Sequence, residues 1–166
     1  LIEEKHGIVI DPLKIDLEDK DVYSNILAAG KTNSVFQFES DGMKAMLKKF
    51  RPESFEDLII LVSMYRPGPL QYLDRVINVK NGIEVKSYLT PQLEPILDKT
   101  YGAIVYQEQV MEICRRLAGY SYGRADLVRR AMAKKKHDVM MEEKKWFIEG
   151  KDTVNPETGE TEVEIL

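Results

Sequence analysis

Cysteine, histidine and tryptophan are scarce in this 166-residue sequence, which holds one Cys, two His and one Trp. A single thiol, Cys114, excludes an internal disulfide and fits a reducing compartment, and His6 and His137 lie too far apart to form a zinc ligand set with it. No run of about 18 apolar residues occurs, which argues against a membrane-spanning helix. Because a Gly-rich phosphate loop, a nucleophile elbow and an HExxH motif are also missing, the residues alone favour a binding module over an enzyme.

The sequence does contain enough apolar residues for a core, since 43% of it is hydrophobic. We expect a single domain over residues 1–150. The net charge of −4 is uneven, because residues 151–166 hold one lysine and five carboxylates and account for all of it. This acidic end is predicted to be a surface hairpin or a disordered tail. The absence of an initiating Met leads us to expect a piece of a larger protein.

The hydrophobic pattern predicts a mainly α fold with one or two short strands. Alternation predicts a brief strand or an extended bridge over residues 34–40, and a short strand or an extended segment over residues 7–17. Helices are predicted at 19–30, 41–50, 55–65, 91–100, 104–119 and 124–136, with a continuation or restart over 137–150.

Two of these helices carry the clearest local signals. Ser54 is a good N-cap for the helix over 55–65, whose apolar residues run nearly all round and predict a central, buried position. The following "RPGP" should end that helix abruptly, because proline has no amide proton to donate. In the helix over 104–119, the stripe Tyr106, Val110, Ile113 and Leu117 predicts an apolar face.

The stretch "RRAMAKKK", residues 129–136, places five positive charges together with no carboxylate among them. On a helical wheel, Lys135 falls on the apolar side, which indicates that the helix ends or bends there. The two arcs of the wheel are Leu127, Val128, Ala131 and Met132 against Arg129, Arg130, Lys134 and Lys136. Cations this close repel one another unless an anion, such as a polyphosphate or a nucleic-acid backbone, lies between them. The alternative is a solvated basic face that complements the helix C-terminus.

Other candidate residues also have two interpretations. Arg66, in "YRPGP", is either a phosphate ligand or a surface or ion-paired residue, and Tyr106, in "YQEQ", is either a site residue or a core aromatic with a wet hydroxyl. No set of carboxylates converges on a two-metal site in the sequence pattern, so no metal-binding or catalytic residue is assigned.

Several motifs, in order and at family-like spacing, resemble the fingers region of the alpha subunit of bacterial DNA polymerase III, a C-family replicative polymerase. The resemblance covers residues 16–150. It rests on "SVFQFESDGM", "FEDLIILVSMYRPGPL", "YGAIVYQEQVM", "LAGYSYGRADLVRRAMAKKK" and "WFIEG".

This resemblance implies a DNA-directed DNA polymerase, a nucleotidyltransferase of chromosomal replication in the bacterial cytoplasm. The catalytic aspartates and the two Mg²⁺ ions would belong to a palm that is not part of this sequence, so the chain alone would be inactive, and residues 1–18 would be an extended segment leading in from the palm. The implied partners are primed DNA template and dNTPs, with the sliding clamp and other replisome subunits bound by other parts of the parent protein, and no membrane.

The resemblance also assigns residues to a nucleotide triphosphate and DNA site. The family's "RRAMGKKK" corresponds to residues 129–136, with Ala133 where Gly is common. The expected site residues are Arg129, Arg130, Lys134, Lys135, Lys136, Arg66 and Tyr106. Two other functions stay open on the residues: an autonomous helical module that binds nucleic acid, and a protein-interaction scaffold.

Overall fold

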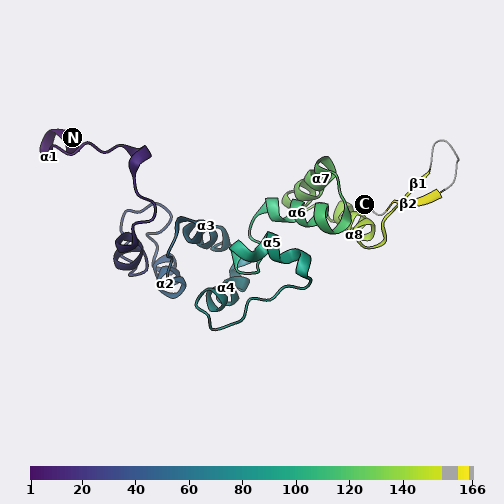
Figure 1. The fold of residues 1–166 in the computed structure, drawn as a ribbon, viewed down its shortest axis with the longest axis horizontal. Helices are drawn as coiled ribbons and strands as arrows, with labels where there is room; N and C mark the ends of the chain where they lie inside the picture. The colour runs from purple at the N-terminus through teal and green to yellow at the C-terminus, as the bar shows by residue number, and fades with distance from the viewer. Residues whose placement is uncertain (155–160, 165–166) are drawn as a thin grey trace. The chain divides into compact units, whose positions relative to one another are not determined.

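The computed structural model describes the backbone of residues 1–154 and 161–164 and the side chains of residues 1–150. It confirms a mainly helical fold (Figure 1). The packing divides the chain into two compact units, Leu1–Leu73 and Asp74–Leu166. The single domain over residues 1–150 stays a prediction, and the two units are described one at a time.

The first unit contains three α-helices and three short turns of other helical types. They are α1 (Ile2–His6), a 3₁₀ turn (Pro12–Lys14), a π-helical turn (Val22–Leu27), α2 (Asp41–Phe50), α3 (Phe55–Met64) and a 3₁₀ turn (Pro69–Tyr72).

The second unit begins within α4 and is built mostly from α-helices. Its elements are α4 (Leu73–Lys80), a 3₁₀ turn (Pro91–Leu93), α5 (Glu94–Leu97), a 3₁₀ turn (Asp98–Thr100), α6 (Gln107–Ala118), α7 (Tyr122–Ala133), α8 (His137–Glu149), β1 (Lys151–Val154) and β2 (Thr161–Glu164).

For residues 7–17 and 34–40, the strand alternative of each prediction is wrong, because residues 1–150 contain no strand. In the stretch 34–40, Ser34 and Gln37 have left-handed backbone conformations, with φ of 61° and 67°, which are incompatible with a pleated strand. The Thr32 hydroxyl donates to the Phe38 carbonyl at 2.5 Å and closes this pair of turns. Over residues 7–17 the only regular element is the 3₁₀ turn Pro12–Lys14, in which the Asp11 carboxylate accepts from the Leu13 amide.

The predicted helix starts in the first unit are confirmed by their caps. The Ser40 hydroxyl accepts from the Met43 amide, and the Ser54 hydroxyl accepts from the Asp57 amide, each at 3.3 Å. The buried Asp57 carboxylate accepts from the Glu53 amide at 2.8 Å and completes the start of α3. As "RPGP" predicts, α3 ends at Met64.

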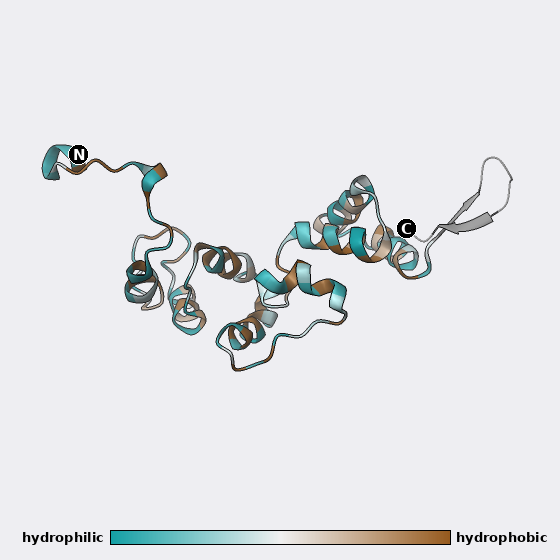
Figure 2. Ribbon diagram, in the orientation of Figure 1, coloured by the Kyte–Doolittle hydropathy of each residue, from teal (hydrophilic) through white to brown (hydrophobic). Residues whose placement is uncertain are grey.

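The core of the first unit lies between the π-helical turn, α2 and α3. Figure 2 shows that α3 is predominantly hydrophobic, yet Phe55 and Ile59 are more than 40% exposed, so the prediction of an all-round buried helix is wrong for one face. The buried apolar residues of this core are Tyr23, Leu27, Met43, Leu47, Phe50, Ile60, Leu61 and Met64.

The core of the second unit centres on α6, α7 and α8, and α8 restarts after α7 as one of the two predicted alternatives. The buried face of α6 is Met111, Cys114 and Ala118, whereas Leu117 is 38% exposed. The predicted stripe is therefore confirmed only in part, because Val110 packs against this core whereas Leu117 does not belong to it. Tyr106, which the predicted stripe included, is the N-cap residue of α6, so its side chain does not follow the helical repeat.

Strands β1 and β2 pair antiparallel, with Lys151 opposite Glu164, as the hairpin alternative for the C-terminal end predicts. Residues 155–160 and 165–166, which belong to the same predicted hairpin or tail, lie outside the described residues. In the described part of the chain, no helix has the length and apolar content needed to cross a bilayer.

Candidate phosphate-binding segment

The basic segment, residues 129–136, spans the last two turns of α7 and the turn that follows it. Ser121 caps the start of the helix through the Arg124 amide at 3.3 Å. At the other end, the Lys136 amide donates to the Ala131 carbonyl at 2.9 Å and the Lys135 amide to the Met132 carbonyl at 3.1 Å. This pair of bonds is a Schellman motif, in which the residue at C′ adopts a left-handed conformation. Lys135 takes that position with φ of 52°.

The helix therefore ends where the wheel predicts, and the reversal at Lys135 takes the following residue out of the helical repeat. All three lysines of the basic segment are exposed, and among the side chains of residues 1–150 none forms an ion pair or a hydrogen bond with Lys134, Lys135 or Lys136. The apolar arc is only partly as predicted. Ala125, Val128 and Ala131 are buried, but Leu127 and Met132 are exposed.

The two arginines are held by a single carboxylate, Asp126, one turn earlier on α7. An Nη atom of Arg129 lies 2.7 Å from Asp126 Oδ1, and Arg130 Nη2 lies 2.6 Å from Asp126 Oδ2. The hydrogen bond from Arg129, together with both positive charges, holds the pKa of Asp126 below its ordinary value. The sequence pattern of an acid at i and bases at i+3 and i+4 could have revealed this clamp.

Arg129 also joins the basic segment to the "YQEQ" motif of α6, since its Nη1 donates to Gln107 Oε1 at 3.0 Å. Beside this bond lies a small open pocket of about 210 Å³, lined by Gln107, Val110, Arg129, Met132 and Ala133. The second unit thus brings together two motifs that are 22 residues apart in the sequence.

The remaining predicted site residues are Arg66 and Tyr106. Arg66 is exposed and lies in the first unit, just after α3, where its carbonyl accepts from the Leu70 amide. Tyr106 is half-buried and precedes α6 as its N-cap residue. Its amide donates to Gln109 Oε1 at 2.9 Å, so its backbone helps to start the helix.

Gln109, which sequence reasoning passed over, is the buried residue that fixes the start of α6. Its Oε1 accepts from the amides of Val105 and Tyr106, and its Nε2 donates to the Ile96 carbonyl and to Thr100 Oγ1. These four bonds satisfy the whole side chain. Only its spacing from Tyr106, three residues into the helix, could have indicated a capping role.

A second feature that the sequence did not reveal is a stacked arginine in α7. The Arg124 guanidinium lies over the rings of Tyr120 and Trp146, 4.4 Å and 4.7 Å from their centres. Arg124 Nε lies 3.3 Å from Glu143 Oε2 on α8, and both side chains are at least 85% buried. Burial and the neighbouring Glu143 raise the pKa of Tyr120 to about 12. Through these contacts Arg124 holds α7 against α8, and it thereby orients the basic segment at the end of α7 relative to α8.

The left-handed conformation of Lys135 leads to a prediction about stability. Replacing Lys135 with glycine should raise the free energy of unfolding by about 0.5–1 kcal/mol, because a Cβ atom is strained at this φ and glycine is not. Urea unfolding followed by the fluorescence of Trp146 measures this change. Lys136→Gly is the matched control, since it removes the same charge at a φ of −77° and should give no gain. Equal gains in the two variants would mean that relief of charge repulsion, and not backbone strain, is responsible.

Within the described part of the chain, no three His, Cys, Asp or Glu side chains lie close enough together to hold a metal ion.

Comparison with known proteins places these features in a family. A family model described as the bacterial DNA polymerase III alpha subunit finger domain matches residues 1–155. The DNA polymerase III subunit alpha of Aquifex aeolicus (strain VF5) is 49% identical over 152 residues, which cover 90% of this chain and 13% of that protein. The protein of the same name from Staphylococcus aureus (strain Mu50) is 46% identical over 149 residues, which cover 90% of this chain and 14% of that protein. The chain spans 13–14% of the length of these relatives, and it belongs to the family of bacterial DNA polymerase III alpha subunit finger domains.

Proposed function

We propose that this chain is the fingers part of a bacterial DNA-directed DNA polymerase that replicates the chromosome in the cytoplasm. In this proposal, the basic segment binds the triphosphate of the incoming dNTP while primed template is bound by the complete enzyme. The family match and the names of the relatives support the polymerase activity. The charge distribution around α7 supports the role of the basic segment.

The observation that carries the proposal is that two of the five cations of the basic segment are paired with a carboxylate and three are not. Arg129 and Arg130 share Asp126, so this trio has a net charge of only +1, whereas Lys134, Lys135 and Lys136 have no ionic partner among the side chains of residues 1–150. An exposed turn with three neighbouring ammonium groups attracts a polyanion, and a triphosphate carries several charges within the span of such a turn.

The mechanism follows from the nature of phosphoryl transfer, in which catalysis is mostly positioning and neutralisation of charge. The three lysines would act as point charges on the triphosphate and on the departing pyrophosphate. Arg130, which is 55% exposed, keeps N–H groups that Asp126 does not bind and could grip a phosphate oxygen. Arg129, held by both Asp126 and Gln107, would position the turn. Movement of the fingers would bring these groups to the nucleotide.

The complete enzyme would need Mg²⁺, which neutralises the transferring phosphoryl group. We propose that residues outside this chain hold it, and no step here passes through it. The chain alone should therefore be inactive as a polymerase. The sliding clamp and other replisome subunits are further proposed partners of the parent protein, through parts outside this chain.

Chemical footprinting of lysines in the full-length enzyme tests the role of the basic segment. We expect Lys134, Lys135 and Lys136 to react several-fold more slowly with an acetylating reagent when a non-hydrolysable dNTP is added to the enzyme on primed DNA, because a bound phosphate covers their amines. Peptide mass spectrometry measures each site. Lys31 and Lys99 are exposed, lie outside the segment and should not change, which makes them internal controls.

The competing function is contact with the nucleic-acid backbone, which the three exposed lysines also favour. If primed DNA alone protects the lysines fully, and the nucleotide adds nothing, the segment binds the duplex. If neither ligand protects them, the segment is a solvated face and the proposed role is wrong.

A further inference from the structure

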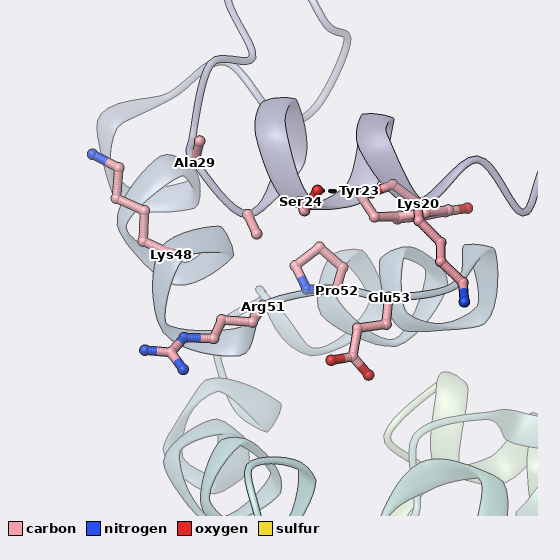
Figure 3. A pocket seen from close by; sticks show the side chains of 9 residues that line it. Lys20, Tyr23, Ser24, Ala29, Lys48, Arg51, Pro52 and Glu53 are labelled. Carbon is pink, nitrogen blue, oxygen red and sulfur yellow. Dashed lines mark hydrogen bonds between the residues drawn. The ribbon is translucent and has the colours of Figure 1, made fainter.

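We propose a second ligand site, in the first unit, that binds a nucleoside phosphate. It is a half-open cavity of about 630 Å³ between the π-helical turn Val22–Leu27 and the end of α2 (Figure 3). This volume falls in the range of small-molecule sites. The proposal goes beyond the function of the basic segment, which lies in the second unit.

Three cations stand around this cavity, Lys20, Lys48 and Arg51, and one carboxylate, Glu53, also lines it. Figure 3 shows Lys48 and Arg51 on one side of it and Lys20 on the other. All three side chains are exposed, and no side chain of residues 1–150 forms an ion pair or a hydrogen bond with any of them. Their charges are therefore available to an anion from outside the chain.

The backbone places two of these cations. Arg51 follows the last residue of α2 in a left-handed conformation, with φ of 52°, and its amide donates to the Leu47 carbonyl at 2.9 Å. Glycine would occupy this position with less strain, so the arginine lowers the free energy of unfolding relative to glycine. Its presence here suits a role for the side chain. Gly30 leaves room for the side chain of Lys48. A Cβ atom at Gly30 would lie only 2.8 Å from Lys48 Cε. The stem of Lys48 thus lies closely over the Gly30 backbone.

The floor of the cavity is apolar except for Ser24. It is formed by the buried Tyr23 and Pro52 and by the half-buried Ala28 and Ala29, which Figure 3 shows, where labelled, between the cations. The Tyr23 hydroxyl donates to the Leu17 carbonyl at 2.7 Å, which fixes the ring. An apolar floor between cations suits a ligand with a flat, weakly polar body and an anionic group, and a planar guanidinium can bind two phosphate oxygens at once. A nucleoside phosphate has this chemistry, whether free or as one unit of a single strand.

The test is a titration of the 166-residue chain with a deoxynucleoside monophosphate, a nucleoside without phosphate, inorganic phosphate and a short single-stranded oligonucleotide. We expect saturable binding of the monophosphate, followed by NMR shifts of the Ala28 and Ala29 methyl groups, and at least about tenfold weaker binding of the nucleoside and of inorganic phosphate. An oligonucleotide that binds more tightly than the monophosphate points to a single strand as the natural source, and equal binding points to a free nucleotide.

Arg51→Gly separates binding from folding. This variant should bind the monophosphate at least about tenfold more weakly, while its unfolding midpoint stays the same or rises, because glycine relieves the left-handed backbone. Lys31→Gln, an exposed lysine of the same unit outside the cavity, is the control and should bind normally. Absence of saturable binding, normal binding by Arg51→Gly, or loss of binding in Lys134→Ala instead would overturn the proposal.

Discussion

Replacing Arg124 with alanine should lower the free energy of unfolding by about 3–5 kcal/mol, the usual cost of removing one partner of a buried ion pair. Glu143, whose side chain is only 9% exposed, would lose the guanidinium that balances it. The rings of Tyr120 and Trp146 would also lose the cation that lies between them. Since Arg124 Nη2 has no hydrogen-bond partner in the described structure, the pair itself is imperfect, and the loss comes mainly from the stranded carboxylate.

Urea unfolding followed by far-UV circular dichroism and by the fluorescence of Trp146, the single tryptophan, measures this loss. Arg115→Ala is the matched control: Arg115 also pairs with a glutamate and lies over a tyrosine ring, but it is 43% exposed, so we expect a loss below about 1 kcal/mol. The double variant Arg124→Met, Glu143→Met should be more stable than Arg124→Met alone, because no charge is left buried. If the double variant is the less stable of the two, packing of the arginine stem, and not the stranded charge, dominates.

Neutralising Arg130 and Lys134 together in the full-length enzyme should weaken apparent nucleotide affinity by at least about tenfold, or 1.4 kcal/mol, with little change in affinity for primed template. Arg130 is the more exposed of the two clamped arginines, and Lys134 begins the unpaired turn. Single-nucleotide incorporation, titrated separately with nucleotide and with template, measures the two affinities. Both substitutions act on exposed groups, so the fold should persist.

The matched control is Arg116→Ala with Lys99→Ala, which removes the same two charges from exposed positions of the same unit outside the basic segment. Equal losses for nucleotide and template in the Arg130 and Lys134 variant would place the segment on the DNA backbone. Unchanged values for both would identify the five cations as a solvated face.

Local features of the fold were predictable because they depend on neighbours in the sequence. Ser40 and Ser54 cap helices through amides three residues away, and the prolines and Gly68 after Met64 cannot continue a helix. The end of α7 near Lys135 was also predictable, since a lysine on the apolar arc conflicts with burial. The family was evident from the order of the motifs, which the comparisons confirm.

Predictions that needed knowledge of packing partners were less successful. Alternating apolar residues over 34–40 predicted a strand, but a strand needs a neighbour to pair with, and the hydroxyl of Thr32 closes turns there instead. The apolar stripe predicted for α6 left out Gln109, a polar residue that is buried and bonded to Ile96 and Thr100. A hydrophobic pattern alone does not reveal a polar residue that is buried in a core with all its hydrogen bonds formed.

The sequence by itself determined where several helices begin and end, though not α1 or α4, how its charges are distributed along the chain, and the family to which it belongs. Only the tertiary structure decided which charges are neutralised. It bound Arg129 to Gln107, buried Arg124 against Glu143 and left three lysines unpaired among the described side chains. The physical reason is the sequence separation of the interacting residues. A helix cap forms within one helical turn. The partners of Arg129 and Arg124 are 22 and 19 residues away, and they come into contact only when α6, α7 and α8 pack together.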